Sequence, residues 1–362
     1  MTPDLPLVDV VTGLRREIER SAVRARNGIK YAAGAEWAPR APTPSVVVWQ
    51  EGKVHLRRYR RDGPARLGPP VLIFIGLVSR ATVFDLQKGK SFVQRLMDGG
   101  FEVFVLDWGV PDEQDAANTL ETYVQGYLPR AIRAIGRETG AEEVNLIGYC
   151  MGGMLGILAV AGQPELPARS LVIIATPVDF RNMTEFVEAL RDGRVDPEAL
   201  IDETGNVPAE TIANSFKIRK PTAEIVQYAN LWQNLWNDEY MEGFQAMGRW
   251  LREQVPFAGG AFRQVVDQWL RADAFINDTL RLGGRQVSLG AIRIPTLAVI
   301  ATRDHIVPES SAEPVTDLLT GTAVDVLRLD AGHASIIVGR TATTVVLPHI
   351  IDWLARHGEE IT

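Results

Sequence analysis

The sequence predicts an α/β fold built around a mostly parallel sheet. Short apolar runs typical of buried strands alternate with helical patterns along most of the chain, and such alternation places helices on both faces of parallel strands. A glycine-framed turn, Gly148-Tyr149-Cys150-Met151-Gly152, follows one of these runs. Because the chain has 362 residues, which is long for a single core, we expect one large domain with an inserted subdomain.

Composition indicates a globular protein of enzyme size. The apolar fraction is 46% and no apolar run approaches the ~18 residues needed to span a bilayer. The formal charge of -7 argues against a nucleic-acid partner. One cysteine leaves no disulfide framework, and no secretory signal is evident. We therefore expect a cytoplasmic protein with no membrane span and no nucleic-acid partner.

The N-terminal segment, residues 1–44, is expected to hold one helix and a connector. Apolar residues recur at helical spacing over residues 8–25 with charged residues opposite, so we expect an amphipathic helix lying on a surface. Residues 28–44, rich in alanine and proline, are expected to be the connector. Two apolar stretches separated by a Glu-Gly-Lys turn, residues 45–50 and 54–59, predict a strand hairpin.

The core is predicted to comprise residues 45–181 and 291–362. Apolar runs predict its buried strands at residues 71–75, 102–107, 144–147, 171–175, 296–301 and 324–329. Helical patterns lie between or after these runs, around residues 90–96, over 120–135, directly after Cys150, and over 345–356. This order predicts a sheet with helices packed on it.

Residues 182–290 interrupt the alternation with helical patterns and no convincing strand, so we expect a helical cap. This segment holds four of the eight tryptophans: Trp232, Trp236, Trp250 and Trp269. Any single tryptophan most often belongs to a packing layer. Among the four tryptophans together, however, we expect some to line an apolar acyl channel.

Cys150 has the setting of a nucleophile elbow, with cysteine where serine usually stands. Glycines two residues before and two after it allow a sharp strand-to-helix turn that lifts the side chain above the sheet edge. The turn also points it at a helix N-terminus, and both features favour a thiolate. A free cysteine is otherwise often a small buried core residue. The glycine frame favours a nucleophile.

An acid and a base follow in the chain order that an elbow fold imposes. Asp304 lies in the loop after the run 296–301, and His333 lies in the loop after the run 324–329. Each candidate therefore lies at the carboxyl end of a strand, where open parallel sheets carry their sites. We predict a catalytic triad of Cys150, Asp304 and His333, and with it an α/β-hydrolase fold with a helical cap insertion.

The other histidines are expected to be bystanders. Three fall within strand or helix patterns: His55, His349 and His357. His305 adjoins Asp304, but neighbours along an extended turn point apart. We therefore expect His305 at the rim of the site and not as the base.

A thiolate attacking an acyl carbonyl needs backbone donors for the developing oxyanion. The predicted donors are the amides of Met151, directly after the nucleophile, and Val78, in the loop after residues 71–75. An acyl group moved from a thioester to Cys150 remains a thioester, so the step is nearly balanced and favours acyl transfer. His333 would deprotonate an incoming hydroxyl, with Asp304 holding its tautomer or assisting the alcohol directly. No metal ion and no cofactor are expected.

Several segments extend this pattern beyond the triad. They are Asp85-Leu86-Gln87, Val105-Leu106-Asp107-Trp108-Gly109-Val110-Pro111, Tyr123-Val124-Gln125-Gly126-Tyr127, Gly148-Tyr149-Cys150-Met151-Gly152-Gly153, Thr176-Pro177-Val178-Asp179-Phe180 and Asp304-His305-Ile306-Val307-Pro308. Together they resemble the polyhydroxyalkanoate synthases. The short length and the Asp-Trp-Gly and Gln-Gly-Tyr segments are most similar to the class III catalytic subunit. The resemblance covers roughly residues 8–357.

The resemblance implies polymerisation of (R)-3-hydroxyacyl-CoA, short-chain units such as 3-hydroxybutyryl-CoA, into a polyester held as a thioester on Cys150. CoA would be the leaving group of the substrate and not a cofactor. His333 would be the base, and Asp304 would help to activate the 3-hydroxyl. The resemblance also implies a homodimer, a non-catalytic class III partner subunit, or both, and a location on polymer granules.

Some positions depart from the family pattern. Met151 stands where class III sequences generally have glutamine, Ala334-Ser335 follow the base where Ile-Gly is usual, and Ser79 stands where asparagine is typical. The departures leave open a divergent synthase with an unusual substrate preference, or a relative that has drifted towards another acyl reaction. A cysteine-dependent thioesterase or polyester depolymerase on the same scaffold is a second alternative. A non-enzymatic granule-binding protein is a third alternative. It would have little reason to keep all three triad residues at the correct strand ends.

Overall fold

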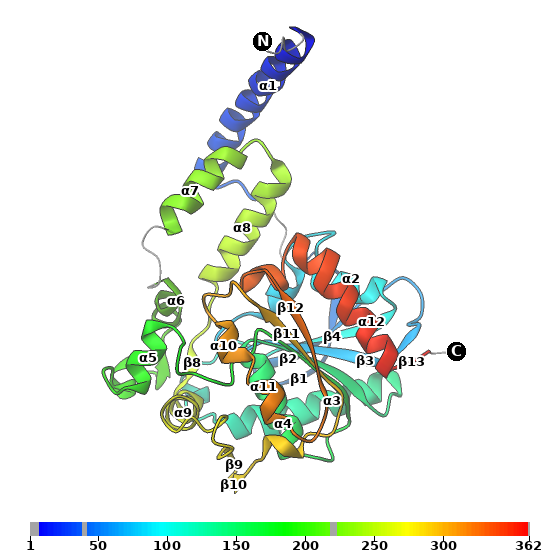
Figure 1. Ribbon diagram of the computed structural model, residues 1–362, viewed down its shortest axis with the longest axis vertical. Coiled ribbons are helices and arrows are strands. Elements are labelled where there is room, and N and C mark those ends of the chain that lie inside the picture. Colours follow the sequence, from blue (N-terminus) through cyan, green and yellow to red (C-terminus); the bar gives the residue numbers. More distant parts are fainter. Residues whose placement is uncertain (1–6, 38–41, 218–222, 361–362) are drawn as a thin grey trace, which may run out of the picture.

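A nine-stranded sheet forms the centre of the molecule in the computed structural model, which describes residues 7–37, 42–217 and 223–360 (Figure 1). Its strands are β1 (Ser45–Glu51), β2 (Val54–Tyr59), β3 (Leu67–Phe74), β4 (Phe101–Asp107), β5 (Val144–Tyr149), β6 (Ala168–Ile174), β11 (Thr296–Ala301), β12 (Val324–Leu329) and β13 (Glu359–Glu360). All six predicted core strands and the predicted hairpin are present.

The strand order is β1-β2-β4-β3-β5-β6-β11-β12, with β13 paired to the start of β3. The hairpin β1–β2 is antiparallel, and β2 is antiparallel to β4. Every neighbouring pair from β4 to β12 is parallel. Because parallel strands end at the same edge, the loops after β3, β5, β11 and β12 gather at one edge of the sheet. The predicted mostly parallel sheet is confirmed.

Helices cover both faces of this sheet. They are α2 (Phe92–Asp98) and α12 (Leu347–His357) on one face, and α3 (Leu128–Thr139) and α4 (Met151–Gly162) on the other. Strand β3 shows the division, because Val71 and Ile73 pack with the first pair of helices whereas Leu72 and Phe74 pack with the second. All four side chains are fully buried, as expected of a strand covered on both faces.

Residues 182–290 are mainly helical. The helices are α5 (Glu185–Arg191), α6 (Ala209–Lys217), α7 (Ala223–Asn234), α8 (Asp238–Arg252) and α9 (Gly259–Gln264), the last continued by a π-helical turn over Val265–Arg271. The expectation that this segment holds no strand was wrong. Two short ladders occur, β7 (Asn206–Val207) with β8 (Phe257–Ala258) and β9 (Arg281–Leu282) with β10 (Arg285–Gln286). Two-residue strands are too short to produce an alternating pattern.

Short helices follow the strand ends elsewhere. They are the 3₁₀ turn η1 (Ala81–Asp85) after β3, and α10 (Glu309–Ala312) and α11 (Val315–Leu318) between β11 and β12. No helix in the described part of the chain is long and apolar enough to cross a membrane.

Helix α1 (Leu7–Ala32) is longer than expected, so the first residues of the predicted connector, from Gly28, are helical. Residues 38–41 of that connector lie outside the described residues. The N-terminal part of the helix does not lie on a surface but extends away from the sheet beyond α7 and α8 (Figure 1), with Leu14 64% and Ile18 63% exposed.

Helix α1 is anchored near its C-terminal end. The Asn27 side-chain amide donates to the Leu235 carbonyl at 2.7 Å and to the Asp238 carboxylate at 2.8 Å. Toward its N-terminus the helix is supported by ion pairs within itself, such as Arg15 with Glu19.

Candidate active site

Cys150 lies at the sharp turn between β5 and α4. Its φ of 55° and ψ of −124° lie in a region that L-residues rarely adopt. The turn needs its glycines, because a Cβ at Gly148 would lie 2.6 Å from the Gly152 carbonyl, and one at Gly152 would lie 2.6 Å from the Phe74 carbonyl. The chain therefore forms the predicted elbow, with Cys150 at the sheet edge and at the N-terminus of α4.

Asp304 follows β11 and His333 follows β12, which are neighbouring parallel strands. The His333 Nδ1 atom lies 2.6 Å from Asp304 Oδ2. The other carboxylate oxygen, Oδ1, accepts the backbone amides of Ile306 at 2.8 Å and Val307 at 2.9 Å. The side chains are 1% exposed for Asp304 and 11% exposed for His333. The carboxylate is thus fixed on both sides and presents one oxygen to the imidazole.

The imidazole of His333 lies beside Cys150 on one side and Asp304 on the other. Burial of the ring lowers the pKa of His333, but interactions with Cys150 and Asp304 more than offset this and raise it to about 10. Tyr149 supports the base, since its ring centroid lies 5.0 Å from that of His333 and its hydroxyl donates to the His333 carbonyl at 3.3 Å. A protonated imidazole next to a cysteine favours the nucleophilic thiolate.

The two predicted oxyanion donors lie at the same end of the sheet. Met151 is the first residue of α4, and Val78 lies in the loop after β3. The two segments touch, because a Cβ at Gly76 would lie 2.6 Å from the Met151 Cβ. Within the described ranges, neither the Met151 amide nor the Val78 amide donates a hydrogen bond to a protein acceptor. Both amides can therefore serve a bound oxyanion.

A cavity of about 100 Å³ lies over Cys150. Its core side includes Cys150, Met151 and His333, and its cap side is formed by Trp250, Leu251 and Gln254. The end of α8 and the residues directly after it therefore lie over the cysteine. The cavity is bounded mainly by apolar atoms, which suits an acyl group better than a charged one.

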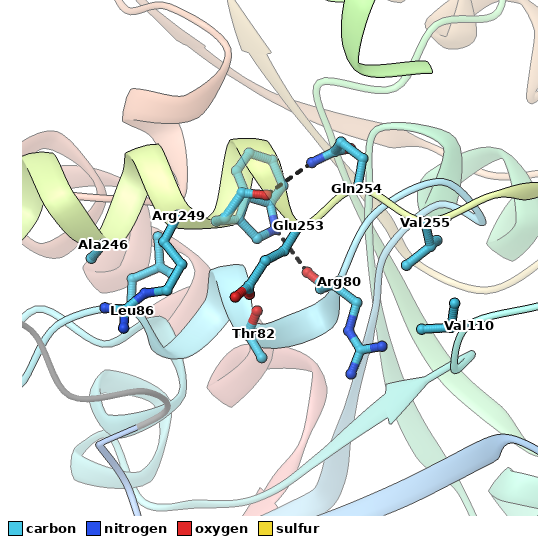
Figure 2. Close-up of a pocket in the computed structure, with 10 residues that line it drawn as sticks. Arg80, Thr82, Leu86, Val110, Ala246, Arg249, Glu253, Gln254 and Val255 are labelled. Carbon is cyan, nitrogen blue, oxygen red and sulfur yellow. Dashed lines mark hydrogen bonds between the residues drawn. The ribbon is translucent and has the colours of Figure 1, made fainter. Parts of the chain in front are cut away.

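A second cavity, of about 390 Å³, shares part of its lining with the first, and Figure 2 shows the residues around it. It is bounded by Arg80 of the core and by Arg249 and Glu253 near the end of α8. Trp250 and Gln254 line both cavities, so these two side chains form the wall between them.

Of the four cap tryptophans singled out in the sequence, Trp250 is the one that lines the cavity over Cys150. Trp269 is buried against Phe275, Trp236 lies under the Arg20 guanidinium, and Trp232 is 68% exposed. Sequence reasoning missed Gln254, since a single glutamine after a helix gives no local signal.

The other histidines lie apart from the triad. His305 is exposed in the residue after Asp304, and His357 bonds the Trp353 carbonyl through Nδ1 at 2.9 Å. His55 belongs to β2 and His349 to α12. Among the described residues, no group of three or more histidine, cysteine, aspartate or glutamate side chains could hold a metal ion.

The sheet order, the elbow and the covering helices define a class of protein. Residues 69–340 match the α/β hydrolase fold family, so the chain is an α/β-hydrolase-fold protein. A hydrolase from Pseudomonas aeruginosa has a similar structure, with a TM-score of 0.52 and 17% identity over 87% of this chain and 99% of that chain. The predicted fold class is confirmed.

Sequence relatives define the family more narrowly. The poly(3-hydroxyalkanoate) polymerase subunit PhaC of Allochromatium vinosum is 32% identical over 330 residues, covering 90% of this chain and 92% of that protein. The PhaC subunit of Haloferax mediterranei is 30% identical over 88% of this chain, which spans 65% of that longer protein. The chain belongs to the poly(3-hydroxyalkanoate) polymerase family, and the resemblance seen in the sequence is confirmed.

Proposed function

We propose that this chain is a poly(3-hydroxyalkanoate) synthase that polymerises (R)-3-hydroxyacyl-CoA and releases CoA. The observation that carries the proposal is the placement of Cys150 beside a hydrogen-bonded His333–Asp304 pair, in a member of the polymerase family. Cysteine suits acyl transfer because the acyl-enzyme is itself a thioester, close in energy to the acyl-CoA from which it forms.

In the first step, the Cys150 thiolate attacks the thioester carbonyl of the substrate. The negative charge that develops on the carbonyl oxygen is stabilised by the amides of Met151 and Val78. The bond from the carbonyl carbon to the CoA sulfur then breaks. His333, protonated at this stage, gives its proton to the departing sulfur, so CoA leaves as a thiol and the acyl group stays on Cys150.

In the second step, a 3-hydroxyl group attacks the acyl-Cys150 thioester and His333 accepts its proton. Asp304 holds the ring so that Nδ1 donates to Oδ2 and Nε2 is free to accept. Direct assistance of the alcohol by Asp304 has less support, because its second oxygen already accepts two backbone amides. When the hydroxyl belongs to a further acyl-CoA, the ester forms, the bond from the carbonyl carbon to the Cys150 sulfur breaks, and Cys150 leaves as the thiolate. The chain, one unit longer, is then a CoA thioester that acylates Cys150 again by the first step.

The small cavity over Cys150 supports a short acyl unit such as 3-hydroxybutyryl. We further propose a homodimer, a non-catalytic partner subunit of the class III type, or both. Exposed apolar side chains on the arm formed by α1 and α7, namely Leu14, Ile18, Ile29 and Trp232, support a protein interface there. An insoluble polyester product would hold the enzyme at the surface of cytoplasmic granules.

The test is incubation of the purified chain with (R)-3-hydroxybutyryl-CoA, with and without a candidate partner subunit. CoA release is followed by chromatography, and chloroform-soluble polyester is measured in the same samples. CoA release with polymer establishes the synthase, and a requirement for the partner supports class III. CoA release with free 3-hydroxybutyrate alone establishes a thioesterase or depolymerase instead.

A further inference from the structure

The loop between β3 and η1, residues 76–80, is hydrogen-bonded to the cap at three successive residues. We call this segment the oxyanion loop, because Val78 belongs to it. The bonds run from the Val255 amide to the Val78 carbonyl (3.1 Å), from Ser79 Oγ to Gln254 Oε1 (2.5 Å), and from Trp250 Nε1 to the Arg80 carbonyl (2.9 Å; Figure 2).

Gln254 lies at the middle of this contact. Gln254 is 8% exposed, and both the oxygen and the nitrogen of its side-chain amide are hydrogen-bonded. Oε1 accepts the Ser79 hydroxyl, and Nε2 donates to the Trp250 carbonyl at 3.0 Å (Figure 2). Because a buried amide with both ends satisfied has one favoured orientation, Gln254 fixes the distance between the cap and the oxyanion loop.

The core packs against Leu77 and Val78 of the oxyanion loop, but its polar contacts are made at the two ends of the loop. Trp108 Nε1 donates to the Ile75 carbonyl at 2.7 Å, just before the loop, and Arg80 pairs with Asp107 at 3.5 Å. Between these points, the polar contacts of Val78 and Ser79 to other elements in the described part of the chain are those made with residues 254 and 255 of the cap. The position of the Val78 amide therefore depends on hydrogen bonds from the cap as well as on packing against the core.

We propose that Gln254 is a positioning residue, which places the Val78 amide for the oxyanion by holding Ser79. The inference rests on the proposed acyl chemistry of Cys150. An oxyanion donor must lie about 2.7–3.1 Å from the oxygen, so a small shift of the loop weakens stabilisation of the transition state.

Two reactions of the Cys150 thiol should respond differently to loss of the Gln254 contact. Acylation of Cys150 by p-nitrophenyl butyrate passes through a charged tetrahedral oxygen and needs the donors. Alkylation by iodoacetamide displaces iodide at carbon, forms the C–S bond and builds no oxyanion. Losing the Gln254 contact should slow the first reaction and not the second.

The test measures both rates in Gln254→Met, which keeps the length of the side chain and removes its amide. We expect kcat for acylation to fall by about 10- to 100-fold, which is part of the effect of losing one oxyanion donor. The rate of alkylation should stay within about twofold of that of the parent chain. Ser79→Ala should give the same pattern, and the double variant should lose no more than either single variant.

The matched control is Gln245→Met on α8, whose side chain bonds Ala35 and Trp37 away from the oxyanion loop. It should leave both rates unchanged. Equal loss of acylation and alkylation in Gln254→Met, or loss of neither, would overturn the proposal. If the parent chain is acylated normally but makes no polymer, the proposed synthase function is overturned. The positioning role of Gln254 is still tested in that case, because the ester assay does not depend on polymer formation.

Discussion

Asp304 and His333 form a 2.6 Å hydrogen bond, and the two carboxylate oxygens of Asp304 have different partners. Oδ2 faces the imidazole, whereas Oδ1 accepts the backbone amides of Ile306 and Val307. The carboxylate cannot turn without breaking bonds to its own loop. The orientation of the base is thus set by the backbone after β11.

Asp304→Asn should inactivate the enzyme while leaving its fold intact. The two backbone amides require an oxygen at Oδ1, so the new NH₂ group would face His333 Nδ1 and force that nitrogen to accept. The proton would then lie on Nε2, and the ring could not take one from the reacting hydroxyl. We expect kcat to fall by about 10⁴-fold.

Asp330→Asn is the control for that change, because Asp330 is an exposed carboxylate three residues before the base. It should retain kcat in the same CoA-release assay. Activity within about tenfold of the parent chain in Asp304→Asn would show that His333 needs no fixed tautomer.

Cys150→Ala should abolish CoA release, since no second thiol exists in the chain to carry the acyl group. A loss of at least about 10⁴-fold is expected when a nucleophile that acts within a triad is removed. Circular dichroism should match the parent protein, because alanine is smaller and relieves rather than adds crowding at the elbow. Full turnover by this variant would contradict the covalent mechanism.

The pH dependence of stability should report the charge on His333. The pKa of His333 in the folded protein is about 10, above the ordinary 6.5. The folded protein therefore binds the imidazole proton more tightly than the unfolded chain does. This contribution is complete below about pH 6.5 and is lost as the pH rises through about 10. Urea unfolding should therefore show the parent chain losing more stability over that interval than His333→Gln. An equal loss in both proteins would contradict the assignment.

Gly148→Ala should destabilise the elbow, because its Cβ would lie 2.6 Å from backbone atoms of Gly152 and Gly153. Forced backbone shifts of this kind cost about 1–3 kcal/mol. Gly28→Ala in α1 is the control, since its Cβ would meet nothing within 4 Å and alanine favours a helix. The free energy of unfolding should fall in the first variant and not in the second.

Leu251→Ala should widen the cavity over Cys150 without removing a bond of the oxyanion loop. Leu251 lines that cavity and is 47% exposed, so its truncation should cost little stability. We expect the ratio of kcat/KM for 3-hydroxyhexanoyl-CoA over 3-hydroxybutyryl-CoA to rise by about tenfold, the usual scale for a methylene or two in an apolar pocket. An unchanged ratio would place the acyl side chain elsewhere.

The sequence was sufficient for the parts of the molecule that local patterns encode. Continuous apolar runs predict strands buried on both faces, and the order of Cys150, Asp304 and His333 predicts that these residues meet at one edge. Contacts made by the cap had no such pattern. Ser79 and Gln254 are 175 residues apart, and neither segment carries a pattern that predicts their contact. The course of α1 could not be predicted either, because an amphipathic helix specifies an apolar face but not what covers it.

The pairing of β13 with the first residues of β3 has a practical consequence for attaching the enzyme to a solid support. Glu359 lies opposite Gly68, whereas the loop beside Cys150 follows Phe74 at the far end of the same strand. The stretch of β3 from Gly68 to Phe74 spans roughly 20 Å. A linker joined beyond Glu360 would therefore leave the catalytic edge facing away from the support, with room for an insoluble product to accumulate.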